Sequence, residues 1–377
     1  MKRVVLMMVG IALVDVVAPV GARQSAVPQG PAPQIQNGRV DTRTGAAIDR
    51  EIASASPKGS TDPVWVAWRV PMVAGDRDMC SWYSDRLGTI RGMWMDDGVI
   101  ADSRPKLTAP TGAIPLEAGT GLVVLARAVG GTVERLRTAG DDCPMDAGGR
   151  SVMWLSNVTP AESLRFLTTL AGPVTTERSM FELERQTAST AVRAIGLHAD
   201  RAADAILENM AAKHLDSSVR HQAATSLGAY RGAFGVGALS KMLAAMPADS
   251  TRNIEERRTL IRAIGQSREA VAVETLRGLT KDADARARSD AWYYYVLRGG
   301  TPTIPDALKA IASDVDESVR KRTVSALGAL PGDAGLTALL QLARSTDNPA
   351  ARKEAVSAIS QSRDPRALAL MEEILKR

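Results

Sequence analysis

The stretch Asp316-Glu-Ser-Val-Arg-Lys-Arg-Thr-Val-Ser-Ala-Leu-Gly328 decides the architecture of this chain, because related stretches recur as Asp216–Gly228 and Asn348–Ser360. Each begins with an Asp or Asn, a residue type that caps the first turn of a helix. Apolar residues three and four positions apart then form one buried stripe, and the small residue at the end favours the end of the helix. A second amphipathic segment follows, for example Thr337–Leu342. The pattern predicts pairs of helices joined by short turns.

The spacing of these stretches predicts a solenoid. A hydrophobic residue followed by a small one recurs at Ile195-Gly196, Leu227-Gly228, Ile264-Gly265, Leu327-Gly328 and Ile359-Ser360, with Tyr295-Val296 in the remaining place. The steps are 32, 37, 31, 32 and 32 residues, which is a period typical of helical repeats. Each repeat buries its apolar face against its neighbours. We therefore expect about six repeats over residues 185–377.

These repeats resemble the HEAT family, especially the short bacterial units first noted in phycobilin lyases. The resemblance rests on the Asp…Val-Arg…Ala…Leu-Gly run of the second and fifth repeats and on Arg363-Asp364-Pro365-Arg366-Ala367 in the sixth. It implies a curved superhelix that contacts other proteins, with the second helix of each repeat on the concave face. It does not imply lyase activity, because the matching residues are packing residues. The first, third and fourth repeats depart from the pattern.

The N-terminus predicts export. Lys2 and Arg3 precede an apolar run, Val4–Val14, and Val20-Gly21-Ala22 then offers a small-residue cleavage site. This is the layout of a secretory signal peptide, residues 1–22, and places the mature protein in the periplasm or otherwise outside the cytoplasm. The alternative is an uncleaved anchor, but the run is short for a membrane helix and Asp15 interrupts it. No stable membrane span is expected after cleavage.

The two cysteines, Cys80 and Cys143, are the whole cysteine content of the chain. In an exported protein an even and sparse count favours one disulfide. The alternative is a pair of free buried thiols. With two cysteines and no clustered histidines, no structural metal site is expected.

The first half predicts a small β domain, so the fold class is α+β. Residues 23–60 are rich in Pro, Gln, Gly and Ser and favour a flexible linker, with a short helix near Ala46–Ala53. Residues 61–158 have strand composition, as in Val64–Val70, and we expect a mostly antiparallel sheet locked by the disulfide. Residues 159–184 are expected to form a connecting helix.

Two local signals refine this domain. Gly130-Gly131 is a two-residue hairpin signal, and it predicts that Arg127 faces Glu134 and that Leu125 faces Leu136. Thr159-Pro160-Ala161-Glu162 supplies an N-cap, a proline at the first helical position and a capping-box glutamate.

Charge excludes one class of partner. The chain carries a net charge of +5, and residues 185–377 contain 28 basic and 22 acidic side chains, a net +6. This excess is modest and lacks the basic runs and interleaved aromatics of nucleic-acid binders. Export also argues against nucleic acid, so the expected partner is another protein.

Three groups of residues are candidate sites, and each also has a simpler structural interpretation. His198, His214 and His221 could form a metal site, but solvated helix ends are favoured. Trp65, Trp68, Trp82, Trp94 and Trp154 could form a stacking platform, but a small domain also needs large core side chains. Asp76, Asp78, Asp96, Asp97 and Asp102 could bind calcium or act as an acid/base pair, but their spacing matches no known loop.

The solenoid offers the stronger binding candidates. Tyr294 replaces the Ala or Ser of other repeats, so its ring must lie across a groove or widen the helix pair, and Tyr293 lies beside it. Lys241, Arg277 and Lys309 occupy one equivalent position in the second helices of three central repeats. Because the resemblance places second helices on the concave face, these three are expected to form a basic ridge that steers an acidic partner.

The sequence therefore favours an exported, non-enzymatic scaffold or adaptor, with no catalytic residue and no cofactor assigned. The motifs His-Glu-x-x-His and Gly-x-Ser-x-Gly do not occur, nor does a phosphate-binding glycine loop. The alternatives are an envelope enzyme, or its regulator, with a site on the Asp- and Trp-rich β domain, and a carbohydrate-binding module built on the tryptophans.

Overall fold

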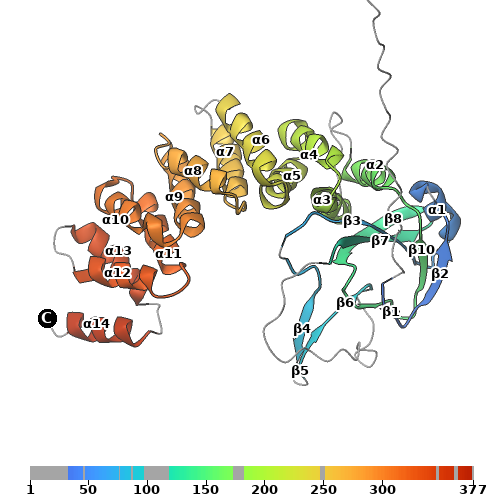
Figure 1. Cartoon of the computed structure of the whole chain (residues 1–377), viewed down its shortest axis with the longest axis horizontal. Coiled ribbons are helices and arrows are strands. Elements are labelled where there is room, and N and C mark those ends of the chain that lie inside the picture. The colour runs from blue at the N-terminus through green and yellow to red at the C-terminus, as the bar shows by residue number, and fades with distance from the viewer. Residues whose placement is uncertain are drawn as a thin grey trace, which may run out of the picture.

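The computed structural model describes residues 33–45, 47–75, 77–85, 88–96, 119–172, 182–246, 251–344, 348–360 and 364–375. A β-rich part is followed by an arc of paired helices (Figure 1), as the α+β class requires. The expected signal peptide, residues 1–22, lies outside the described residues. Among the described helices, none has the length and apolar character needed to cross a membrane.

The main sheet is mixed, where the sequence led us to expect mostly antiparallel pairing. Its strand order is β2 (Arg39–Arg43), β10 (Ser151–Leu155), β3 (Val64–Pro71), β7 (Gly121–Val129) and β8 (Thr132–Gly140). β7 is antiparallel to β3 and β8, as expected. β10 lies between β2 and β3 and runs parallel to both. β10 is the last strand of the sheet in chain order, and it inserts between two earlier strands instead of forming a hairpin with the strand before it.

The flexible linker expected over residues 23–60 is wrong for its second half, whereas the short helix expected near Ala46–Ala53 is present. Residues 33–60 contain β1 (Ile35–Gln36), the edge strand β2 and helix α1 (Ile48–Ala55). The polar composition hid two short apolar contacts: Ile48 and Ile52 lie on one side of α1 and are buried in the core.

A β-bulge changes the predicted register of the hairpin. Val129 pairs with Thr132 and Ala128 with Val133, but Arg127 then pairs with Arg135. Glu134 is the extra residue of the bulge, so Leu125 faces Arg137 instead of Leu136. The expected charge pair survives, because Arg127 Nη1 lies 2.6 Å from Glu134 Oε2.

Both faces of the sheet are covered. Trp68 and other alternate residues face α1, α2 (Pro160–Ala171) and α3 (Glu182–Leu197) in one large core. Trp65 and Trp154 belong to a second core on the opposite face, which includes Cys143. A second, three-stranded sheet has the order β1, β9 (Met145–Asp146) and β6 (Met93–Trp94), with β9 in the centre. A separate hairpin joins β4 (Trp82–Asp85) and β5 (Gly88–Arg91). The Cys80–Cys143 disulfide is present, with Cα atoms 5.3 Å apart.

Among the described residues, six helix pairs follow the sheet. They are α3 with α4 (Ala202–Lys213), α5 (Ser217–Tyr230) with α6 (Gly232–Ala245), α7 (Thr251–Ile264) with α8 (Ala270–Leu279), α9 (Ala285–Gly299) with α10 (Ile304–Ser313), α11 (Glu317–Gly328) with α12 (Ala334–Arg344), and α13 (Pro349–Ile359) with α14 (Pro365–Leu375). A single 3₁₀ turn, Thr301–Thr303, precedes α10. Asp216, Asp316 and Asn348 cap α5, α11 and α13 through their side-chain oxygens, as predicted.

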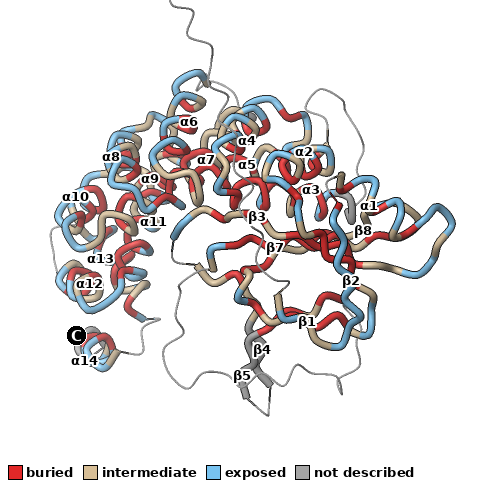
Figure 2. The backbone as a smooth tube through the Cα atoms, turned by 45° about the vertical axis from the view of Figure 1, so that its right-hand side comes forward, coloured by how far each residue is buried: buried red, intermediate tan, exposed pale blue. Residues whose placement is uncertain are grey.

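The first helix of each pair lies on the inner side of the arc, which corrects the expected concave face. In Figures 1 and 2, α5, α7, α9 and α11 lie inside and α4, α6, α8 and α10 lie outside. First helices also pack extensively against one another along the arc, whereas successive second helices touch little. The glycine of the Leu-Gly pair explains this close approach: a Cβ on Gly228 would lie 1.8 Å from the Ala263 carbonyl oxygen. α5 continues past Gly228 to Tyr230, so this glycine serves packing rather than helix termination.

A buried hydrogen-bonded chain joins the sheet to the first repeat. Trp68 Nε1 on β3 donates to Ser163 Oγ on α2 at 2.9 Å, and Ser163 Oγ lies 3.1 Å from His198 Nε2 at the end of α3. All three side chains are buried. Backbone bonds continue the contact, from Val73 N to the Leu197 carbonyl and from Ala199 N to the Pro71 carbonyl, each at 2.9 Å. The β domain therefore covers the first repeat and shares its core.

The burial of His198 predicts a specific pH dependence. Burial lowers the pKa of this imidazole to about 4, from 6.5. As the pH falls below 6.5, His198 becomes protonated in the unfolded chain but stays neutral in the folded one. Stability is therefore lost between pH 6.5 and 4, and the loss is complete below pH 4. The free energy of unfolding should fall by about 3 kcal/mol through this residue.

His198→Gln, which does not titrate, is the comparison for this effect. Chemical denaturation at pH 7 and pH 4 should show a smaller loss of stability in the variant than in the wild type. Parallel pH dependence in the two proteins would contradict the prediction.

The disulfide predicts a local loss on reduction. Its cysteines are 63 residues apart, and a loop of that size stabilises the folded state by about 4 kcal/mol in the chain-entropy model. The Cys80→Ala/Cys143→Ala variant should lose about this much in the sheet, as followed by the denaturant dependence of tryptophan fluorescence. Non-reducing peptide mapping should show the two peptides linked. Alkylation of both thiols in unfolded, unreduced protein would rule the bridge out.

Candidate functional site

The two tyrosines named from the sequence lie on α9, one of the inner helices. The half-buried ring of Tyr294 packs over Gly265 at the end of α7, where an added Cβ would come within 2.3 Å of the ring. Glycine therefore makes the room that the larger side chain needs, and Tyr294 lies across the neighbouring helix. Tyr293 meets Tyr294 edge-on, with ring centroids 5.2 Å apart. An aromatic pair thus lies in the middle of the inner face.

Guanidinium groups surround this aromatic pair. The Arg322 side chain of α11 stacks on the Tyr293 ring, with Cζ 3.7 Å from the ring centroid. On the α7 side, Arg262 Nε lies 3.2 Å from Asp290 Oδ2, and Arg258 Nε lies 2.9 Å from the same oxygen. Glu255 also pairs with Arg258 at 3.1 Å, so two carboxylates offset these two arginines, and Arg322 carries the positive charge without a carboxylate partner among the described residues.

The basic ridge lies on the opposite face from the one expected. Lys241, Arg277 and Lys309 are exposed on α6, α8 and α10, which are outer helices (Figure 2). Arg277 comes within 4.0 Å of Glu274. The three cations and the tyrosines are therefore separate candidate surfaces, because the helices that carry them lie on opposite sides of the arc.

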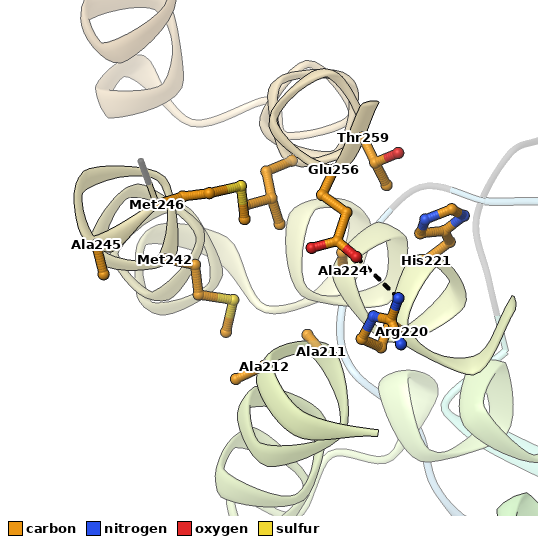
Figure 3. A pocket seen from close by; sticks show the side chains of 11 residues that line it. Ala211, Ala212, Arg220, His221, Ala224, Met242, Ala245, Met246, Glu256 and Thr259 are labelled. Atoms are coloured by element: carbon orange, nitrogen blue, oxygen red, sulfur yellow. Dashed lines mark hydrogen bonds and ion pairs between the residues drawn. The ribbon is translucent and has the colours of Figure 1, made fainter. Parts of the chain in front are cut away.

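A pocket of about 310 Å³ opens among α4, α5, α6 and α7. Figure 3 shows Met242 and Met246 on one side and the Arg220–Glu256 ion pair on another, with His221 nearby. The remaining lining residues are Ala211, Ala212, Ala224, Ala245, Thr259 and Leu260. The walls are mostly apolar, and the charges of the ion pair, at 2.8 Å, offset each other. This chemistry suits an uncharged, apolar group.

Two small residues explain why the pocket lies at this repeat. Ala224 stands three residues before the Leu-Gly pair, where the other repeats have Val192, Ile261, Trp292, Val324 and Val356. Ala211 stands five residues before the capping Asp216, where the fifth repeat has the buried Ile311 five residues before Asp316. The sequence contained this signal, but it is visible only once the repeats are aligned position by position.

The arginine of the Val-Arg signature is a connector between repeats, a role that sequence reasoning missed. Arg288 Nη1 donates to the Asp282 carbonyl at 2.7 Å in the turn before its own helix. Its Nε and Nη2 donate to the Asp314 carboxylate, at 2.9 and 3.2 Å, in the turn before the next helix pair. Arg220 and Arg320 make the same carbonyl bond in their repeats, and Arg257 donates to the Met246 carbonyl at 3.4 Å.

The three histidines do not converge, and two of them are buried, so solvated helix ends describe only His221. His198 belongs to the junction with the sheet. His214 Nδ1 accepts a hydrogen bond from the Asp216 amide at 3.1 Å, just as Asp314 Oδ1 accepts one from the Asp316 amide at 2.9 Å. The first repeat has Ala188 where later repeats have the connector arginine. A histidine side chain carries no negative charge, so this turn does not need the arginine that a buried carboxylate requires.

The β-domain candidates are structural where they are described. Trp65, Trp68 and Trp154 are buried, so they cannot form an exposed stacking platform. Asp96 lies between two arginines, 3.2 Å from Arg127 Nε and 3.0 Å from Arg150 Nε. Asp78 Oδ1 accepts a hydrogen bond from the Cys80 amide at 3.0 Å. The side chain of Trp82, and residues Asp76, Asp97 and Asp102, lie outside the described part of the chain. Among described residues no group of His, Cys, Asp or Glu has metal-site geometry.

Comparison with known proteins confirms the HEAT-like repeats at the C-terminal end. The family model for HEAT repeats matches residues 304–377, which span α10 to α14. This segment consists of HEAT repeats, and the N-terminal β domain is not matched. A search of curated proteins found no match.

Solved structures match part of this chain. The complex of CpcE and CpcF of phycocyanin lyase from Nostoc sp. PCC7120 is 19% identical over 56% of this chain and 86% of that chain, with a TM-score of 0.31. Human deoxyhypusine hydroxylase in complex with glycerol is 14% identical over 56% and 90%, with a TM-score of 0.30. Kap121p bound to RanGTP is 14% identical over 53% and 25%, with a TM-score of 0.33. At these values the likenesses carry no argument about what this chain binds.

The connector role predicts an uneven cost for two neighbouring arginines. Arg288→Met keeps the aliphatic stem but removes the ion-pair partner of Asp314 and the side-chain donor to the Asp282 carbonyl, and should cost about 2–3 kcal/mol of unfolding free energy. Arg286→Met removes only exposed ion pairs with Glu255 and Asp284 and should cost less than about 0.5 kcal/mol. Thermal and chemical denaturation give both values. Equal costs would contradict the connector role.

Proposed function

We propose that this protein is an exported scaffold that binds another protein through the inner face of its solenoid. The observation that carries the proposal is the polar and aromatic surface that the first helices expose along the arc. Tyr293 and Tyr294 lie at its centre, flanked by Arg262 and Arg322. Aromatic and arginine side chains are the residue types that most often dominate binding energy at protein interfaces.

The proposed partner is acidic. Residues 185–377 carry a net charge of +6, and a surface with this excess steers an oppositely charged protein during association. On the outer face, Lys241, Arg277 and Lys309 offer a second basic surface. We place the main contact on the inner face because it adds aromatic rings to the charge.

Export is supported by two observations. The N-terminal sequence has the layout of a signal peptide, and the Cys80–Cys143 disulfide is compatible with an oxidising compartment. N-terminal sequencing of the native protein should find Arg23 as the first residue. Recovery of an intact Met1 in the membrane fraction would favour the anchor instead.

Two matched triple variants test the scaffold function. Arg193, Thr225 and Ser325 are exposed on inner helices at the position that Tyr293 occupies in its own repeat. The inner variant, Arg193→Glu/Thr225→Glu/Ser325→Glu, should slow association with the acidic partner by about tenfold or more. The outer control is Lys241→Glu/Arg277→Glu/Lys309→Glu, which removes more positive charge than the inner variant but should slow association less, because salt screens charges on the opposite side of the arc from the partner.

The partner for this test is isolated by affinity purification of the tagged mature protein from its native envelope, and association is then measured at low and high salt. One stoichiometric protein partner supports the proposal. Absence of any such partner contradicts the scaffold function. A loss confined to the outer variant would move the binding surface to the basic ridge.

A further inference from the structure

We propose that Arg322, held by Tyr293, and Arg262 form a carboxylate-binding site for an acidic segment of the protein partner. This inference rests on the proposed function and names the residues and the partner chemistry of the inner face. It brings in two arginines that sequence reasoning did not single out.

The stack on Tyr293 fixes one face of the Arg322 guanidinium. With Cζ 3.7 Å from the ring centroid, the ring covers that face of the group. The N–H donors of a guanidinium point outward in its own plane, so the stack leaves them accessible. Among the described residues, no carboxylate or carbonyl forms a hydrogen bond or ion pair with the Arg322 side chain. A planar fork of donors is therefore pre-organised and uncompensated, which is the geometry that binds a carboxylate with two parallel hydrogen bonds.

A second guanidinium faces the same aromatic pair from α7. Arg262 contacts the Asp290 carboxylate through Nε, but that carboxylate also binds Arg258. The Asp290 side chain is only 4% exposed, whereas the Arg262 side chain is 41% exposed. Glu255 also pairs with Arg258 at 3.1 Å, so Asp290 offsets the charge of Arg262. Only the Nε of Arg262 is engaged, however, and the exposed side chain keeps its Nη donors for a ligand.

The Tyr294 hydroxyl shows that the two arginines act on one region. Burial raises the pKa of the Tyr294 phenol, and both Arg322 and Arg262 oppose that rise. The two guanidiniums therefore lie within electrostatic range of a single hydroxyl, one from each neighbouring repeat. The two guanidinium groups therefore lie on either side of α9, next to the rings of Tyr293 and Tyr294.

This arrangement fits an acidic polypeptide segment. Two arginines supply bidentate hydrogen bonds to Asp or Glu side chains. The edges and faces of Tyr293 and Tyr294 supply apolar contact for the aliphatic part of the same side chains. The charge excess is local, and the face curves along several repeats, so an extended segment gains contacts that an isolated anion would not.

The probe for this site is a fluorescein-labelled, glutamate-rich peptide, with a glutamine-rich peptide of equal length as control. Fluorescence anisotropy with the full mature chain at low salt should show binding of the first peptide and not of the second. Arg322→Gln should weaken binding about tenfold or more, because charge-assisted hydrogen bonds contribute about 1.5–3 kcal/mol. The peptide affinity of Arg322→Lys should lie between those of the wild type and Arg322→Gln, since an ammonium keeps the charge but lacks the planar pair of donors.

Two further variants keep the test decisive. Ser325→Glu leaves the packing in place and puts a competing carboxylate one helical turn from Arg322, and it should also weaken binding. The triple Glu variant of Lys241, Arg277 and Lys309 should bind the peptide nearly as well as the wild type. Unchanged affinity in folded Arg322→Gln, or an equal loss in the outer variant, would overturn the site. Competition by inorganic phosphate is a further control. If phosphate displaces the peptide when its concentration equals that of the peptide carboxylates, the site recognises any anion, and the proposal is overturned.

The outcomes separate this site from the proposed function. If the purified partner binds Arg322→Gln as tightly as the wild type, the site is wrong and the scaffold function stands. If the glutamate-rich peptide depends on Arg322 but no envelope protein binds the chain, the site stands and the scaffold function is wrong.

Discussion

The buried hydrogen bonds from Trp68 through Ser163 to His198 are the constraint on which the rest of the structure depends. They join the sheet, α2 and the first repeat within one core. A solenoid normally needs a terminal unit that covers the apolar face of its first repeat. Here the five-stranded sheet and α2 provide that cover. The sheet therefore fixes where the arc of helices begins, and the arc opens beside the β domain (Figure 1).

Close packing of the first helices then sets the curvature. Gly228 on α5 lies against the Ala263 carbonyl of α7, where a Cβ would come within 2 Å. Connector arginines such as Arg288 bind each repeat to the turn of the next. Because the inner helices approach closely while the outer ones spread, the inner face is continuous. Charged and aromatic side chains on that face are left for a partner, and this is the physical basis of the proposed scaffold function.

The solenoid could be predicted from the sequence because its signals are local and repeated: a capping Asp316, apolar residues at helical spacing and a final small residue. The disulfide was also predictable, since only one pairing exists. Which helices form the inner face could not be predicted. The sequence around Gly228 looks the same whether the glycine ends a helix or allows a neighbouring helix to pack closely against it. Burial of His198 depends on contact with β3, which lies more than 100 residues earlier in the chain, and β10 pairs with strands from both sides of α1. Long-range pairing of this kind leaves no mark in a single sequence.

The most direct test of this account is native-state hydrogen exchange with increasing denaturant. If the sheet covers the first repeat, amides of β3 and β7 and amides of α3 should share one opening free energy and one denaturant dependence, because they belong to one core. The helices after Tyr295, which form a separate hydrophobic cluster, should open at lower denaturant. Early opening of α3 together with α11 and α13, while the sheet stays protected, would contradict the account.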